Sequence, residues 1–260
     1  MNLNKGEFWD ITANAFRGCS KVSAGCDNCW ALRMAWRHAH NPKTKPQYKH
    51  LVQAVGRDDL HVYPVWSGQT SYDLLWAAPL RAMRKRKRVF LNGMGDMFHE
   101  ANLPADIQHC LAMIKSCPQH LFIVATKRPA VALYHLRMAE WQIPNLILLT
   151  STEDQAAWDQ RVPYIADCKP HVAAVGAICE PLLGPIFEPT NLQALDWLLV
   201  GGETGPGARY MDAVWNHTLL QLATANSVPY FFKQWGGPRG RRRYTFMQTW
   251  DGGPKIWKSW

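Results

Sequence analysis

Residues 121–154 read LFIVATKRPAVALYHLRMAEWQIPNLILLTSTED. Two short apolar runs, Leu121–Ala125 and Leu146–Thr150, flank a segment of helical character that starts near Pro129. This alternation is typical of a parallel βαβ unit. The residues after the second run, Ser151-Thr152-Glu153-Asp154, favour the start of another helix because their side chains cap free backbone N–H groups. The stretch therefore predicts an α/β fold built on a parallel sheet.

The alternation continues on both sides of this stretch. It gives about seven strands, enough for a partial or near-complete parallel (βα) barrel. Residues 181–190, PLLGPIFEPT, contain too much proline for a long helix, and residues 41–79 are expected to be an insertion of loops with a hairpin. The other expected strands are Thr12–Phe16, Val89–Asn92, Val172–Ile178, Trp197–Val200 and Pro229–Phe232, and the other expected helices cover Asn28–Ala39 or begin near Pro104, Glu153 and Asp212.

The composition indicates a globular protein of the cytoplasm. Of the 260 residues 47% are hydrophobic, which is sufficient for a full core. We predict one barrel over residues 1–236, followed by a basic, aromatic C-terminal tail over residues 237–260. No apolar run approaches the length of a transmembrane helix, and MNLNKGEFWDIT at the start lacks the apolar region of a secretion signal. A membrane partner and a secreted protein are therefore not expected.

Much of the net charge of +9 lies in two basic runs, at residues 81–88 and 239–243. Aromatic residues follow the second run. Cations beside aromatic rings suit nucleic acid, because phosphates pair with the cations and bases stack on the rings. We expect a polyanionic partner, with Arg241 and Arg242 among the residues that bind it. The alternative is a tail whose tryptophans pack back on the body.

Polar residues follow every expected strand. In parallel α/β proteins the carboxyl ends of the strands form the edge where ligands and catalytic residues lie. Several polar segments in register predict a functional site on this edge. The segments are GCSKVSAGCDNCW (18–30), GMGD (93–96), TKR (126–128), STE (151–153), CEP (179–181), GGET (201–204) and KQW (233–235).

Cys19, Cys26 and Cys29 stand close together, whereas the other four cysteines are scattered downstream. In a reducing compartment, clustered cysteines indicate a metal site. One interpretation is a structural zinc ion with His38 or His40 as its fourth ligand. The other is an iron–sulfur cluster in which three thiolates leave one iron free to bind a further ligand. The polar edge around the cysteines favours the second interpretation.

Six ordered segments resemble the phage-associated three-Cys-motif family, whose members are similar to radical-SAM enzymes. Trp30 stands where this family more often has tyrosine. The C-x6-C-x2-C spacing departs from the wider radical-SAM pattern C-x3-C-x2-C, which leaves the geometry of the cysteine segment open. The matching segments are FRGCSKVSAGCDNCWALRMAWR, VFLNGMGDMFHE, FIVATKRP, CEPLLGPI, LDWLLVGGETGPGAR and VPYFFKQWG.

The resemblance implies a barrel of the radical-SAM type, a [4Fe-4S] cluster held by Cys19, Cys26 and Cys29, and S-adenosylmethionine across the strand ends. Asp96 would face the amino group of this cosubstrate, and Ser151 and Glu153 its ribose or carboxylate. Helix capping is the alternative for these three residues. The expected cofactor-binding residues are Gly93, Met94, Gly95, Asp96, Ser151, Glu153, Gly201, Gly202 and Glu203.

The substrate side of the edge is expected to carry the remaining functional residues. The catalytic candidates are Lys127, Glu180 and Lys233, for which an ion pair without a catalytic role is the alternative. Arg128 is a candidate for binding a phosphate or carboxylate, and Trp235 for stacking on a base. The expected substrate-binding residues are Arg128, Gln234, Trp235, Arg241 and Arg242.

The expected function is a radical-SAM enzyme that modifies a nucleic-acid base. The phage setting of the family implies rearrangement (isomerisation) of an amino-acid-modified thymine in phage DNA. The reaction would take place in the cytoplasm of the infected host cell, with an external electron donor. Two alternatives stay open: a zinc-stabilised nucleic-acid-binding protein without catalysis, and a radical-SAM enzyme that acts on RNA or protein.

Overall fold

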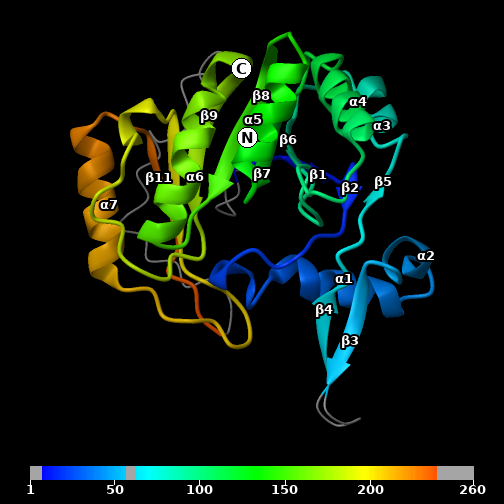
Figure 1. Cartoon of the computed structure of the whole chain (residues 1–260), viewed down its shortest axis with the longest axis horizontal. Helices are drawn as coiled ribbons and strands as arrows, with labels where there is room; N and C mark the ends of the chain where they lie inside the picture. Colours follow the sequence, from blue (N-terminus) through cyan, green and yellow to red (C-terminus); the bar gives the residue numbers. More distant parts are fainter. Residues whose placement is uncertain (1–7, 57–61, 239–260) are drawn as a thin grey trace.

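The computed structural model describes residues 8–56 and 62–238. Arg241, Arg242 and almost all of the expected C-terminal tail lie outside these residues. The described chain forms a seven-stranded sheet in the order β1-β6-β7-β8-β9-β10-β11, and every neighbouring pair is parallel (Figure 1). The expected parallel α/β architecture is confirmed.

The strands of this sheet lie close to their expected positions. Most are buried on both faces, which explains their nearly continuous apolar sequences. The strands are β1 (Ile11–Ala13), β6 (Arg88–Leu91), β7 (Leu121–Thr126), β8 (Ile143–Ser151), β9 (Val172–Cys179), β10 (Trp197–Gly201) and β11 (Tyr230–Gln234).

Four helices connect consecutive strands of the sheet. Asp154 and Asp212 cap two of them, accepting hydrogen bonds from Ala157 N and Val214 N at 2.8 Å. The proline-rich connection from β9 to β10 holds only the short 3-10 helix η3 (Leu192–Ala194), as expected. No helix of the described ranges has the length and apolar character needed to cross a bilayer. The connecting helices are α4 (Pro104–Lys115), α5 (Pro129–Met138), α6 (Gln155–Asp167) and α7 (Ala213–Ala225).

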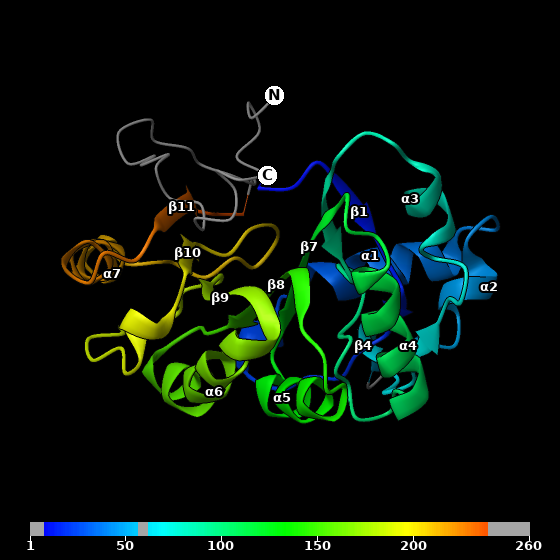
Figure 2. The ribbon, with the colours of Figure 1, turned by 90° about the horizontal axis from the view of Figure 1, so that it is seen from above.

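The sheet is curled, with the connecting helices on its outer face (Figure 2). Alternate strand residues such as Val124 and Leu148 pack with these helices in the main core. The residues between them, such as Ile123, form a second apolar layer on the concave face, where Phe8 and Trp9 pack against it. β1 and β11 are the two edges of the described sheet, so the barrel is a partial one.

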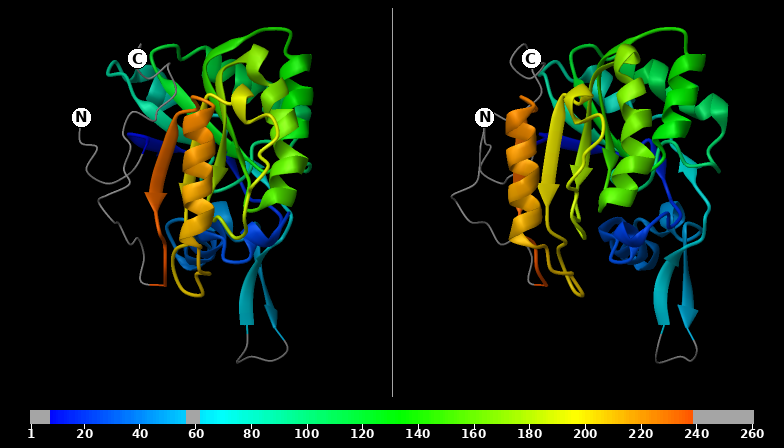
Figure 3. Two further views of the ribbon diagram at one scale, coloured as in Figure 1. Left: turned by 90° about the vertical axis from the view of Figure 1, so that its left-hand side faces the viewer. Right: turned by 60° about the vertical axis from the view of Figure 1, so that its left-hand side comes forward.

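An insertion follows the first helix, α1 (Trp30–His40), and includes the expected hairpin. The hairpin consists of β3 (Val52–Gly56) and β4 (Val62–Trp66) and projects beyond the carboxyl ends of the sheet (Figure 3). α1 packs against it through a small apolar cluster. The other elements of this region are α2 (Lys45–Tyr48), β5 (Ser71–Tyr72), which pairs with β2 (Phe16–Arg17), and α3 (Ala78–Ala82), which leads into β6.

The expected first strand, Thr12–Phe16, is wrong in its extent. β1 ends at Ala13, and Phe16 belongs to the separate β2–β5 pair. Two asparagine side chains explain the break. Asn14 accepts a hydrogen bond from Met94 N at 3.0 Å, and Asn92 accepts one from Phe16 N at 2.8 Å. These side-chain bonds replace ladder bonds and turn the chain toward the cysteines.

Candidate functional site

The cysteine loop, defined as residues 18–29, lies across the carboxyl ends of the strands. In Figure 1 this loop and α1 pass beneath the arrowheads of the sheet. Gly18 begins the loop with a parallel bridge to Gly95, and Gly18 N donates to Met94 O at 3.1 Å. A Cβ at Gly95 would meet the Gly18 carbonyl oxygen at 2.9 Å, so the β6 loop and the cysteine loop touch backbone to backbone.

The three thiols of the loop are free and half-buried. Burial raises the pKa of the Cys19 thiol to about 12, and the neighbouring Asp96 carboxylate adds to the rise. The Arg128 guanidinium, whose Nη1 lies 3.8 Å from Cys19 Sγ, opposes it. The carbonyl of Cys29 accepts a hydrogen bond from Arg33 N in the first turn of α1.

Arg128 joins the cysteine loop to the ends of β6 and β7. Its guanidinium donates to Asp96 Oδ2 at 3.1 Å, to Ser20 Oγ at 2.7 Å and to Glu100 Oε2 at 2.7 Å. Asp96 is itself buried and also accepts from Thr126 Oγ1 at 2.7 Å. The observed partners of Asp96 and Arg128 are protein groups that position the loop. Their expected contacts with a cosubstrate and a substrate stay predictions.

Glu153 and Arg161 form a second ion pair, under the middle of the loop. Both side chains are 3% exposed, and Arg161 Nη1 lies 2.9 Å from Glu153 Oε2. Burial disfavours ionisation of Glu153, but hydrogen bonds and the charges of Arg161 and Lys127 outweigh it and lower the pKa of the carboxyl. A Cβ at Gly25 would meet Glu153 Oε2 at 3.1 Å and Lys127 Cε at 3.5 Å. The ends of β7 and β8 therefore support the centre of the loop.

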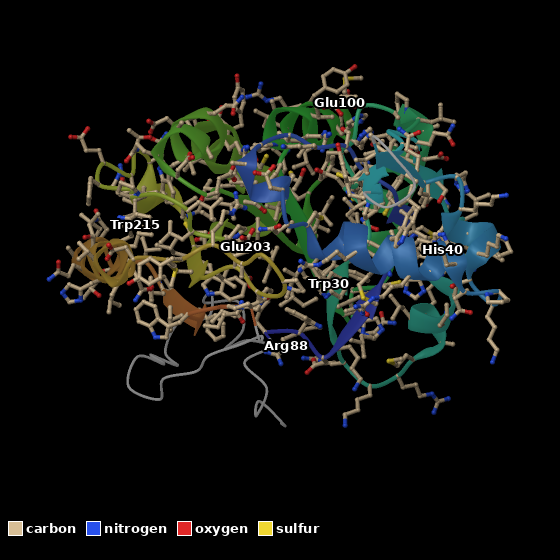
Figure 4. The ribbon with its side chains drawn as sticks, turned by 90° about the horizontal axis from the view of Figure 1, so that it is seen from below. Trp30, His40, Arg88, Glu100, Glu203 and Trp215 are labelled. Atoms are coloured by element: carbon tan, nitrogen blue, oxygen red, sulfur yellow. The ribbon has the colours of Figure 1, made fainter. Side chains whose placement is uncertain are left out.

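Glu203 fastens the last part of the cysteine loop. It accepts from Asn28 Nδ2 at 2.9 Å and from Arg209 Nη2 at 2.6 Å. Arg209 also donates to Asp27 Oδ2 at 3.2 Å and to Ala24 O at 2.9 Å. Figure 4 places Glu203 on the strand-end side of the molecule, next to the loop that precedes Trp30. We call this arrangement of Glu203, Arg209 and Asn28 the clasp.

Glu180, Lys233 and Gln234 meet at the ends of β9 and β11. Lys233 Nζ lies 2.8 and 2.7 Å from the two carboxylate oxygens of Glu180, and Gln234 Nε2 donates to Glu180 Oε1. The Lys233 ammonium also lies 5.9 Å from the centre of the Trp9 ring. The structure thus brings together two of the three expected catalytic residues, whereas Lys127 lies beside Glu153 and Gly25.

The other expected site residues contact neighbouring protein groups, and their expected binding roles stay predictions. Met94 is buried in the apolar cluster of α1 and the hairpin. A Cβ at Gly201 would touch Glu180, and one at Gly202 would overlap the Trp235 carbonyl oxygen. Trp235 packs on the Phe232 ring at 4.9 Å between centroids. The remaining two residues are Gly93, beside the Phe90 ring, and Ser151, whose carbonyl accepts from Arg161.

The zinc interpretation with His38 or His40 as fourth ligand is wrong for this structure. Both lie near the far end of α1 from the cysteines, and Figure 4 shows Trp30 and His40 at its opposite ends. The 11 residues of α1 span about 16 Å, whereas zinc–nitrogen bonds measure about 2 Å. Within the described ranges no group of three or more His, Cys, Asp or Glu side chains is arranged to hold a metal ion.

The donor set fits a cluster held by three thiolates. In a cubane each thiolate binds a separate iron, so the sulfurs need not converge on one ion. The three loop thiols are partly accessible soft donors, whereas the other four cysteines are buried. The expected ligands therefore stay Cys19, Cys26 and Cys29.

Comparison with known protein families gives one match over most of the chain. A family model described as "Protein of unknown function (DUF5131)" matches residues 4–254. The chain belongs to the DUF5131 family. The match covers the cysteine loop and every strand of the sheet. No curated protein and no solved structure matches the chain.

Several residues of the DUF5131 site escaped the sequence analysis. Arg209 donates to the cysteine loop, the loop's own Asn28 and Ser20 anchor it to Glu203 and Arg128, and Arg161 holds Glu153. Arg209 is the last residue of LDWLLVGGETGPGAR, one of the segments that carry the family resemblance. Nothing in that segment indicates that Arg209 pairs with the cysteine loop. Arg161 lies in the middle of α6 and carries no such signal.

Proposed function

We propose that this DUF5131 protein is a radical-SAM enzyme that modifies a base of a nucleic acid. The specific reaction we propose is rearrangement of an amino-acid-modified thymine in phage DNA, in the cytoplasm of an infected host cell. The observation that carries the proposal is the position of the three-thiol loop. Side chains from the ends of β6, β7, β8 and β10 support it over the carboxyl edge of a curled parallel sheet.

The cofactors would supply the radical chemistry and the chain the positioning. When bound, a [4Fe-4S] cluster with one open iron would bind S-adenosylmethionine and pass it an electron from an external donor. Cys19, Cys26 and Cys29 would each bind one iron. Arg128, close to Cys19 Sγ, would offset part of the negative charge of the thiolates.

The ion pair of Glu180 and Lys233 supports a role toward the substrate. Lys233 is 13% and Glu180 21% exposed, so solvent screens the pair only partly. An ammonium and a carboxylate side by side suit the amino and carboxylate groups of an amino-acid substituent. We propose that Lys233 and Glu180 orient such a substituent while one of its unactivated carbons gives up a hydrogen atom. The 5′-deoxyadenosyl group released from S-adenosylmethionine would take up this atom and become 5′-deoxyadenosine.

The test is anaerobic reconstitution of the full chain with iron and sulfide. We expect about four irons and four sulfides per chain. We also expect 5′-deoxyadenosine from S-adenosylmethionine and a reductant, with more of it when DNA with the modified base is present. The variants Cys19→Ser, Cys26→Ser and Cys29→Ser should lose the cluster. Cys110→Ser, a change on α4 in the main core, is the matched control and should keep it.

The alternatives are outcomes of the same experiment. Zinc without iron or sulfide would contradict the enzyme and favour a zinc-stabilised nucleic-acid-binding protein. An intact cluster whose turnover depends on RNA or a protein, with DNA inert, would retain the radical chemistry and overturn the DNA substrate.

A further inference from the structure

The cysteine loop continues directly into a basic part of the molecule. We call α1, α2 and the β3–β4 hairpin together the basic arm. Residues 28–66, which span the arm, hold four positive charges in excess, because Arg57 lies beside Asp58 and Asp59 between β3 and β4. Residues 28–56 contain no aspartate or glutamate and include five cations: Arg33, Arg37, Lys43, Lys45 and Lys49. Arg33 binds the carbonyls of Thr204 and Pro206 beside the clasp, whereas the side chains of the other four face solvent. A surface with such an excess of cations over carboxylates attracts anions.

The lysines of the basic arm are available for an external anion. The ion-paired lysines of the described ranges are Lys21, Lys169 and Lys233, so Lys43, Lys45 and Lys49 have no carboxylate partner there. An open hollow of about 550 Å³ lies among these residues. Its lining consists of Pro42, Lys45, Pro46, Lys49 and His50.

The basic run at residues 81–88 lies on the opposite side of the molecule. It connects α3 to the first residue of β6, so it stands at the amino ends of the strands. In Figure 1 α3 lies at the top, whereas α2 and the hairpin lie below the arrowheads of the sheet. Arg88 is also paired with Asp10. Of these two basic regions, only the basic arm lies at the carboxyl ends of the strands, where the cysteine loop also lies.

Trp30 links the basic arm to the cysteine loop. It is the first residue of α1, directly after Cys29, and its side chain is 57% exposed. An exposed tryptophan beside cations offers a face on which a base can stack. α1 is about 16 Å long, and the arm lysines follow its far end in the chain.

Resting on the nucleic-acid substrate proposed above, we infer that the basic arm is the surface that binds the substrate strand. Lys43, Lys45 and Lys49 contact its phosphates, and Trp30 stacks on a base between them and the cysteine loop. The arm thus holds the strand while the modified base reaches the edge of the sheet. Contacts with phosphates do not distinguish one DNA sequence from another. The arm therefore contributes affinity and positions the strand.

The test measures the affinity of the full chain for a fluorescent 30-nucleotide DNA strand by anisotropy at several salt concentrations. The variant K43Q/K45Q/K49Q should weaken binding at least tenfold at low salt and reduce the slope of log K against log salt by about 2. Trp30→Ala should weaken binding about tenfold, and Trp30→Phe much less. The matched control is R81Q/R84Q/K85Q, which removes the same charge at the opposite end of the sheet and should change affinity less than twofold.

Equal losses in the two triple variants would overturn the inference, because they would reflect net charge alone. So would unchanged affinity in the arm variant, or arm-dependent binding of polyglutamate without binding of DNA.

Iron content and 5′-deoxyadenosine formation without DNA are measured on the same samples. If the protein takes up iron but K43Q/K45Q/K49Q binds DNA as tightly as the wild type, the DNA-binding surface is wrong and the proposed enzyme is not contradicted. If the triple variant binds DNA more weakly but the protein never takes up iron, the proposed enzyme is wrong and the DNA-binding surface is not contradicted. Unchanged thermal unfolding of each variant shows that the fold is kept.

Discussion

At the residue scale, the clasp joins two parts of the chain that are 175 positions apart. The Glu203 side chain is 5% exposed, and its carboxylate receives donors from Asn28 and from the side chain and backbone of Arg209. A buried carboxylate is costly unless such donors surround it. The last part of the cysteine loop is therefore held by a side chain that is remote in sequence.

Replacing Glu203 tests this dependence. Glu203→Gln should lower the free energy of unfolding by about 1–3 kcal/mol, since it removes the charge that Arg209 pairs with, and Arg209 is itself partly exposed to solvent. It should also reduce iron uptake by the cysteine loop. Chemical denaturation and iron analysis provide the measurements. The control is Asp167→Asn, which breaks an exposed ion pair with Arg137 and should lower the free energy of unfolding by less than about 0.5 kcal/mol. Equal losses of stability in the two variants would contradict the role of the clasp.

The Glu153–Arg161 pair leads to a prediction about pH. In the wild type the pKa of Glu153 is lowered, so its contribution to stability is present above the unfolded pKa and is lost as pH falls through the folded one. Arg161→Met should cost about 3–5 kcal/mol at pH 8, because it leaves a buried carboxylate without its partner. Burial then raises the pKa of Glu153, so the carboxyl binds a proton more readily and the loss shrinks as pH falls toward 5. A loss that is constant over this range would show that packing, and not charge, explains it.

At the element scale, the start of α6 depends on one cap. Asp154 Oδ1 accepts from Ala157 N at 2.8 Å and so satisfies one of the free N–H groups of the first turn. Asp154→Ala should lower the free energy of unfolding by about 1 kcal/mol, and Asp154→Asn by a few tenths, since asparagine caps nearly as well. Thermal and urea unfolding provide the measurements. A loss in Asp154→Asn as large as in Asp154→Ala would indicate that charge, and not the hydrogen bond, matters here.

Elements were predictable where their signals are local. The apolar runs of β7 and β8 and the prolines that open α4 and α5 act within a few residues, so their positions followed from the sequence. The break between β1 and β2 did not, because it depends on hydrogen bonds that Asn14 and Asn92 make across the sheet. The clasp was missed for the same reason: no pattern within a short window indicates a pairing over such a separation.

At the scale of the whole molecule, one edge of the sheet concentrates the candidate chemistry. Strand-end residues were predictable as a group, since parallel strands bring their carboxyl ends together. Their individual protein partners were not, and several residues expected to bind a cosubstrate also hold the cysteine loop, Asp96 and Glu203 among them. The loop is therefore connected by side chains to the ends of β6, β7, β8 and β10. A group that binds the loop should consequently stabilise the whole sheet against unfolding.

This coupling predicts that the proposed cluster, once bound, stabilises the fold. A ligand that binds the native state alone adds about 2.7 kcal/mol of stability at a hundredfold excess over its dissociation constant. For a chain of this size such a gain corresponds to a rise in Tm of about 5 to 10 °C. We expect this rise on anaerobic reconstitution, and its loss when a chelator removes the iron. Cys26→Ser should unfold at the temperature of the iron-free wild type and gain nothing from reconstitution, because two remaining thiolates do not hold the cluster. A wild-type protein with full iron content and an unchanged Tm would show that the loop binds its cluster without support from the sheet.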